Sequence, residues 1–117
     1  CIYSRPQVAS VGFNEENVKK NNIPYKIGKF PLIGNGKALA TGDNSGFIKT
    51  IFNKESGELL GAHMVGPEVT ELISIYSLAI KMEATELDLM SIVFPHPTIS
   101  ESLHESVLDA YDRAIHI

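Results

Sequence analysis

The hydrophobic pattern of the chain changes once, at Gly66–Pro67, and this change constrains the fold more than any other feature. Before it, short apolar segments rich in β-branched and aromatic residues are separated by glycine-containing turns, which is typical of strands. After it, apolar residues recur at helical spacing. Strands followed by helices favour an α+β class, with helices packed on one face of an antiparallel β-sheet. We predict three to five strands in a single domain over residues 1–117.

The expected strands lie in the first 65 residues. The strongest is Phe47–Phe52, and a glycine-containing hairpin loop joins it to Leu59–Val65. A strand over Tyr25–Phe30 precedes them along the chain. An edge strand near the N-terminus is interrupted by Pro6, since proline has no N–H to donate to a neighbouring strand. Residues 34–46 contain two turn clusters and an apolar pattern too weak to predict an element.

Four helices are expected. A surface helix over residues 14–21 starts at an asparagine N-cap followed by two glutamates, which suit the positive end of the helix dipole. Residues 68–82 carry apolar side chains on more than one face, so this helix is expected to be buried on two sides. A brief helix begins near Thr85, and a last helix is predicted from Ile99 to Ala114. The helix over residues 68–82 therefore needs a second surface besides its own sheet.

Composition and charge exclude several classes of protein. Cys1 is the only cysteine, which excludes an internal disulfide framework, a cysteine-based zinc site and an intramolecular CxxC redox pair. No apolar run approaches the roughly 18 residues of a membrane-spanning helix, so no membrane span is predicted. Residues 1–54 hold eight basic and three acidic side chains, whereas residues 55–117 hold two and eleven. The acidic half argues against nucleic acid as a partner, because binding phosphate groups needs dense lysine and arginine.

Reactive side chains concentrate in one segment, residues 95–101, which reads Pro-His-Pro-Thr-Ile-Ser-Glu. The proline after His96 disfavours helical backbone at that residue, and both flanking prolines stiffen the loop. One interpretation is structural: Thr98 caps the last helix in a capping box with Glu101.

The other interpretation is functional. The Glu101 carboxylate accepts a hydrogen bond from one nitrogen of His96, which fixes its tautomer, favours a higher pKa and frees the other nitrogen for proton transfer. No serine or cysteine lies in a nucleophile motif, so the group that reacts with His96 is expected to come from elsewhere.

The remaining histidines are weaker candidates. His63 falls in an apolar strand and is expected to be a core or sheet residue, His104 is expected on the surface of the last helix, and His116 is near the C-terminal end. No two histidines have the His-x-x-x-His spacing of a metal site, so no metal site is predicted.

The segment His96–Glu101 resembles the His-Pro-Thr-x-x-Glu signature of the flavin-linked pyridine nucleotide–disulfide oxidoreductases, in their C-terminal dimerisation domain. The resemblance covers essentially the whole chain, with further similar segments at Tyr3–Gly12, Ala38–Gly42, Gly46–Lys49 and Gly57–Pro67. Within the family, the residues from Ala62 to Pro67 and the following Glu71 are more similar to the branch that oxidises dihydrolipoamide than to the glutathione-reducing branch.

The resemblance implies a homodimer in which this domain forms most of the interface. His96 would then enter the partner subunit's active site as the proton acceptor and donor, with Glu101 orienting it. His96 and Pro97 would approach the partner's flavin, with a cis peptide between them. The redox cysteine pair and the FAD and NAD sites would lie in N-terminal domains of a longer enzyme. The chain alone is therefore expected to hold no cofactor and to be inactive.

Three further expectations follow from the resemblance. Phe94 stands where lipoamide enzymes usually carry a histidine, a departure that leaves the His–Glu pair intact. The acidic half is expected to steer the acyltransferase core of a 2-oxo acid dehydrogenase complex towards the dimer. The enzyme is expected in the cytoplasm if bacterial and in the mitochondrial matrix if eukaryotic. A glutathione-reductase-like substrate and a dimerisation module without chemistry stay open as alternatives.

Overall fold

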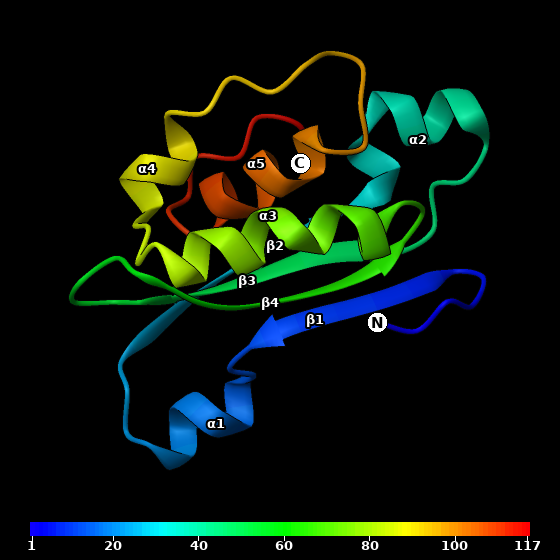
Figure 1. Ribbon diagram of the computed structural model, residues 1–117. Helices are drawn as coiled ribbons and strands as arrows, with labels where there is room; N and C mark the ends of the chain where they lie inside the picture. The colour runs from blue at the N-terminus through cyan, green and yellow to red at the C-terminus, as the bar shows by residue number, and fades with distance from the viewer.

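The computed structural model describes residues 1–117 as a four-stranded sheet with helices (Figure 1). The sheet has the order β1-β4-β3-β2, and every neighbouring pair is antiparallel. Its strands are β1 (Gln7–Gly12), β2 (Tyr25–Pro31), β3 (Phe47–Asn53) and β4 (Leu59–Gly66). The helices are α1 (Glu15–Lys20), η1 (Leu32–Gly34), α2 (Gly36–Thr41), α3 (Val69–Lys81), α4 (Glu86–Met90) and α5 (Glu101–Asp109). The predicted α+β class is confirmed, with a strand count inside the expected range.

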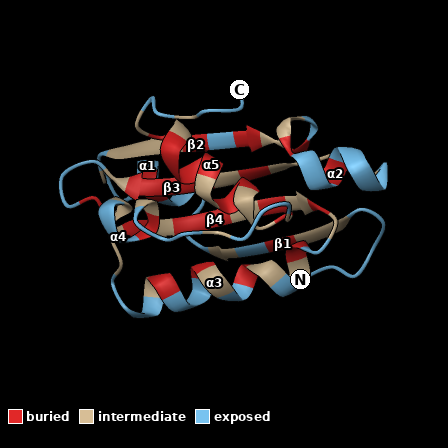
Figure 2. Ribbon diagram, turned by 90° about the horizontal axis from the view of Figure 1, so that it is seen from above, coloured by how far each residue is buried: buried red, intermediate tan, exposed pale blue.

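The helices divide unequally between the two faces of the sheet. Figure 1 shows α3, α4 and α5 on one face, whereas α1 lies beyond the other. The main core fills the space between the sheet and α3 and α5, and Figure 2 shows buried stretches on the strands and on both of these helices. On the opposite side, α1 buries Val18, and its Glu15 pairs with Lys49 of β3. One face of the sheet thus carries the layer that builds the site described below.

Two elements differ from the sequence prediction. Residues 36–41 form α2, because Asn35 accepts a hydrogen bond from the Ala38 amide at 2.9 Å and Gly42 ends the helix in the left-handed conformation, with φ 74°. The last helix, predicted from Ile99 to Ala114, spans only Glu101–Asp109. The chain turns back at Asp112, where φ is 57°, so the final residues cannot continue the helix.

The position of α5 on the sheet depends on a glycine and on buried polar groups. A Cβ at Gly28 of β2 would overlap the carbonyl oxygen of Ser106, so only glycine lets the α5 backbone approach this closely. The Ser106 hydroxyl bonds with Thr50 of β3 at 3.0 Å, and Asp109 accepts from the Lys29 amide at 2.8 Å. These contacts fix the second half of α5 on the sheet, and Glu101 is the first residue of the same helix.

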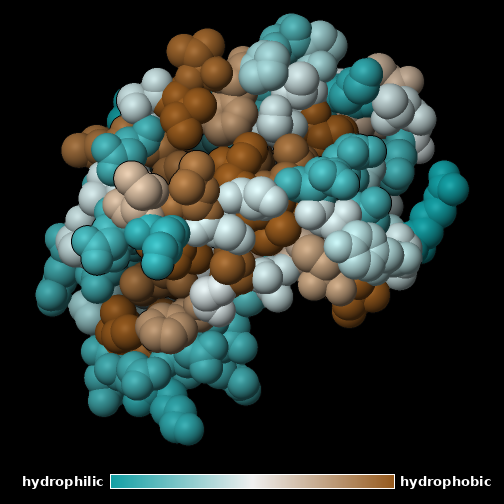
Figure 3. All heavy atoms as spheres, viewed as in Figure 1, coloured by the Kyte–Doolittle hydropathy of each residue, from teal (hydrophilic) through white to brown (hydrophobic).

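Helix α3 is less completely covered than its apolar sequence suggests. Val69, Ile73 and Tyr76 face the core, and the Tyr76 hydroxyl donates to the Leu103 carbonyl of α5 at 2.9 Å. On the outer side, Leu78 is 63% exposed, and the C-cap residue Met82 is 71% exposed. Figure 3 shows hydrophobic side chains at the surface over α3 and the segment above it. None of the helices combines the length and apolar content needed to cross a membrane.

Candidate functional site

His96 and Glu101 lie together at the start of α5. The loop between α4 and α5 carries His96 back over the first turn of the helix, and its Nδ1 lies 3.0 Å and 3.1 Å from the two carboxylate oxygens of Glu101. Because an ionised carboxylate only accepts hydrogen bonds, Nδ1 carries the proton and Nε2 is left with its lone pair. The peptide between His96 and Pro97 is cis, as expected from the resemblance.

The first turn of α5 confirms part of the predicted capping box. Glu101 Oε2 accepts from the Thr98 amide at 3.0 Å, which is one half of the predicted capping box. The other half is wrong: Ser100 is the N-cap residue, and the Thr98 hydroxyl donates to the Pro95 carbonyl at 2.7 Å instead. The structural and functional interpretations of Glu101 are therefore compatible, because one carboxylate serves both the loop backbone and the imidazole.

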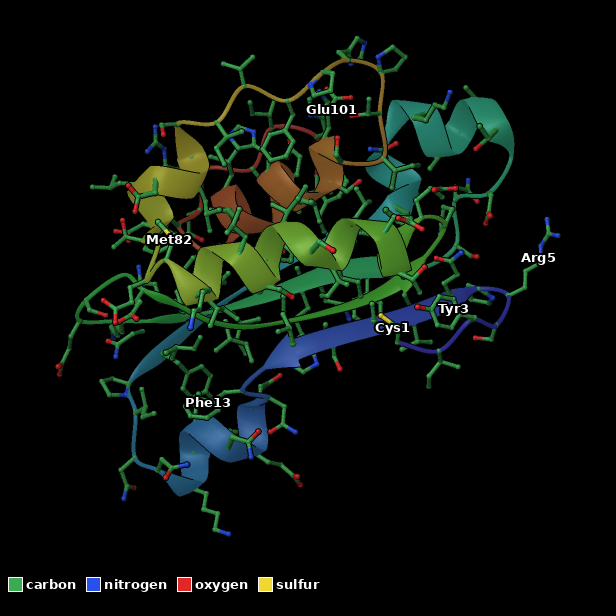
Figure 4. All side chains as sticks on the ribbon, in the orientation of Figure 1. Cys1, Tyr3, Arg5, Phe13, Met82 and Glu101 are labelled. Carbon is green, nitrogen blue, oxygen red and sulfur yellow. The ribbon has the colours of Figure 1, made fainter.

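The pair is open to solvent on the imidazole side. The His96 side chain is 77% exposed, while that of Glu101 is 29% exposed. Figure 4 shows Glu101 below the loop that crosses the top of the molecule, at the beginning of α5. The half-buried carboxylate is held by its hydrogen bonds to Thr98 and His96, and exposure of the ring leaves Nε2 accessible to a reacting group from another molecule.

A cavity of about 470 Å³ lies beside this pair. Its wall combines the α4–α5 loop, α5, the turn before α2 and the C-terminal segment. Its ionisable lining residues are His96, Glu101, His104, Glu105 and His116. No group of three or more histidine, cysteine or acidic side chains is arranged to hold a metal ion.

The other predicted histidines take structural positions. His104 is half-buried rather than a surface residue, because its Nε2 donates to the Met90 carbonyl at 3.0 Å and its ring packs against Phe94. Phe94, the departure from the family pattern, thus fills space between the loop and α5. His63 is in β4, as expected, and its Nε2 lies 3.1 Å from the Phe13 carbonyl.

A second His–Glu pair was missed by sequence reasoning. Glu105, only 5% exposed, accepts hydrogen bonds from the amides of Ile115 and His116 at 3.0 Å and 3.3 Å, and from His116 Nδ1 at 2.7 Å. Burial raises the pKa of Glu105, but these hydrogen bonds outweigh it and leave the pKa below its ordinary value of 4.5. No local pattern signals the pair, because it forms only when the chain turns back after α5.

We expect the C-terminal segment to detach from α5 as the pH falls below about 4.5. A folded-state pKa below the ordinary value means that the stabilisation is complete above that value and is lost as the pH falls through the folded pKa. Hydrogen exchange of the Ile115 and His116 amides, corrected for intrinsic rates, measures the release. Glu105→Gln is the control, in which protection should be low and independent of pH. Unchanged protection of the native chain down to about pH 3 would contradict the assignment.

Comparison with known proteins agrees with the fold. A family described as the pyridine nucleotide-disulphide oxidoreductase dimerisation domain matches residues 1–107. The chain therefore belongs to the pyridine nucleotide-disulphide oxidoreductase family, as its dimerisation domain. This confirms the resemblance carried by the His-Pro-Thr-x-x-Glu segment.

Curated relatives are similar over almost the entire chain. Dihydrolipoyl dehydrogenases of Zymomonas mobilis and Rhizobium etli are 58% and 52% identical, over 99% and 98% of this chain. A mitochondrial dihydrolipoyl dehydrogenase of Arabidopsis thaliana is 40% identical over 99%. The chain spans about a quarter of the length of these relatives, since it covers 25%, 24% and 23% of them.

Solved structures share the fold. The crystal structure of LpdA from Mycobacterium tuberculosis superposes with a TM-score of 0.84 at 25% identity, over 90% of this chain and 23% of that one. The flavoprotein disulfide reductase RclA of Escherichia coli has the same TM-score at 24% identity, over 88% of this chain and 24% of that one. The likeness to RclA shows a common fold only.

Proposed function

We propose that this chain is the dimerisation domain of a dihydrolipoyl dehydrogenase and that His96 takes part in dihydrolipoamide oxidation in the partner subunit's active site. The observation that supports this most directly is the His96–Glu101 pair, with the carboxylate on Nδ1 and Nε2 exposed. The identity of 39–58% to proteins named dihydrolipoyl dehydrogenase favours lipoamide over glutathione as the substrate class.

The pair suits proton transfer to and from a thiol. A thiol has an ordinary pKa of about 8.5, so it needs a base near neutral pH to become a nucleophilic thiolate. Nε2 of His96 accepts the thiol proton, and the Glu101 carboxylate, 3.0 Å from Nδ1, stabilises the resulting imidazolium. The thiolate then attacks a disulfide, forming one S–S bond while another breaks. The reacting disulfide must come from outside this chain, whose one cysteine is Cys1.

The FAD and NAD of the full-length enzyme do not fit this chain's own topology. All strand pairings are antiparallel, so there is no βαβ unit with a glycine loop at a helix N-terminus to bind a dinucleotide. We infer that other domains of the full-length enzyme bind both cofactors. The exposed positions of His96 and Pro97 are compatible with a flavin approaching from a partner subunit.

A homodimer provides the second surface that α3 lacks. Leu78 on the outer side of this helix and Met82 at its C-terminal end are exposed, and exposed apolar side chains that lie close together favour burial against another protein surface. A two-fold dimer covers the same patch on both subunits. We also propose that the acidic half attracts the acyltransferase core of a 2-oxo acid dehydrogenase complex, a proposal supported by the excess of acidic side chains in residues 55–117. The purely structural alternative leaves the exposed His96–Glu101 pair without a role.

Mixed dimers of the full-length enzyme test whether His96 acts across the interface. One subunit carries His96→Gln, and the other lacks its redox-active dithiol. If His96 acts in the partner's site, one of the two sites is intact, and turnover of dihydrolipoamide is about half that of the wild type. If the histidine acts within its own subunit, both sites are defective. Activity no higher than that of either parent homodimer would therefore refute the proposal.

A further inference from the structure

Asn35 connects the His96 loop to a part of the chain more than sixty residues away. It lies between η1 and α2, is only 4% exposed and lines the cavity that contains His96 and Glu101. Its Nδ2 donates to the Thr98 carbonyl at 3.0 Å and to the Ser102 hydroxyl at 2.8 Å, and its Oδ1 accepts from the Ala38 amide. Both amide hydrogens and the oxygen are thus engaged.

The Thr98 backbone, which Asn35 holds, is also part of the His96–Glu101 arrangement. The Thr98 amide donates to Glu101 Oε2, and the same carboxylate contacts His96 Nδ1. Asn35 therefore binds the carbonyl of a residue whose amide binds Glu101. His96 lies only two residues before Thr98, so a change in the backbone angles of Thr98 would move the loop that carries the imidazole.

We propose that Asn35 is a positioning residue for the His96–Glu101 pair, an inference that rests on the proton-transfer role proposed above. The Asn35 amide holds the Thr98 carbonyl so that the Thr98 amide and the His96 ring meet one carboxylate. The same Nδ2 donates to the hydroxyl of Ser102 on α5, so one donor group binds both the loop and the helix. A catalytic geometry that is off by about 1 Å costs turnover rather than binding.

A purely structural role would be the capping of α2, and an isosteric variant separates the two. Asn35→Asp keeps the oxygen that accepts from the Ala38 amide, and aspartate is as good an N-cap as asparagine. It removes the donor and places a carboxylate against the Thr98 carbonyl. Asn35→Ser is the second variant. It keeps a capping oxygen and adds no charge, so it tests the loss of the donor if the aspartate variant does not fold.

The experiment measures kcat and KM of the full-length enzyme for dihydrolipoamide, together with its melting temperature. We expect kcat of Asn35→Asp to fall about 10–100-fold with KM nearly unchanged, the range typical of lost supporting hydrogen bonds. Asn14→Ala is the matched control, because it removes the N-cap of the distant α1 and leaves the site untouched. Its kcat should equal that of the wild type.

The same variants made in a His96→Gln background separate failure of this inference from failure of the proposed function. A residue that acts through His96 has no further effect once His96 is gone, so Asn35→Asp should not lower the residual kcat. A lower melting temperature with unchanged kcat in both Asn35 variants would overturn the inference while leaving the function standing. Normal turnover of His96→Gln itself would refute the proposed function, and the inference with it.

Discussion

His96→Gln in the full-length enzyme is expected to lower dihydrolipoamide turnover by about 10²–10⁴-fold, the range that a positioned general acid–base contributes. Glutamine is of similar size and polar, but it cannot take up a proton near neutral pH. The Glu101 carboxylate then has no imidazolium to stabilise at 3.0 Å. Steady-state kinetics measure the loss, and the visible spectrum of the bound flavin checks that FAD remains in place.

His63→Gln is the matched control for this substitution. His63 belongs to β4 and contacts only the Phe13 carbonyl among hydrogen-bonding groups, so its loss leaves the pair intact. Its turnover should stay at the wild-type level. The turnover of Glu101→Gln is expected to lie between those of His96→Gln and His63→Gln, because its hydrogen bond to Nδ1 persists without the negative charge. Near-normal turnover of His96→Gln would remove the proposed role of the histidine.

Gly28→Ala is expected to lower the free energy of unfolding by about 1–3 kcal/mol or more, as overpacking at a rigid contact does. The added Cβ would overlap the Ser106 carbonyl and lie 2.8 Å from the nitrogen of Ala110, the C-cap residue, and both atoms belong to the backbone of α5 and its C-terminal cap. A backbone cannot rotate away as a side chain can, so α5 must move off β2. That movement also disturbs the buried Ser106–Thr50 contact. Urea unfolding of the 117-residue chain measures the change.

Gly36→Ala provides the opposite control for the same chemical change. A Cβ at Gly36 meets nothing within 4 Å, and Gly36 is the first residue of α2. Alanine there restricts the unfolded chain without a clash, and we expect a gain of about 0.4–1 kcal/mol. If Gly28→Ala were as stable as Gly36→Ala, the close approach of α5 to β2 would not limit this fold.

The predictions that succeeded concern neighbours along the chain. The hairpin of β3 and β4 follows from alternating β-branched residues around a glycine loop. The contact of His96 with Glu101 also joins residues only five positions apart. It lies at a helix start that Pro97 and the capping pattern predict from the sequence. The length of α5 was overestimated because its end depends on where the final residues fold back, at Asp112.

The remaining contacts of the site join distant parts of the chain. Asn35 binds Thr98 across 63 positions, and Glu105 binds His116 after a reversal of the chain. Nothing in the local pattern around Asn35 distinguishes an ordinary turn residue from a buried hydrogen-bond donor.

By itself, the sequence determined the α+β class and the strands, because backbone periodicity acts over a few residues, and it left open whether Glu101 caps the last helix or pairs with His96. Only the tertiary structure decided which side chains hold that pair in place and which side of α3 stays exposed. Those features depend on packing between segments, where a buried polar group must find its partner wherever the fold brings one within reach.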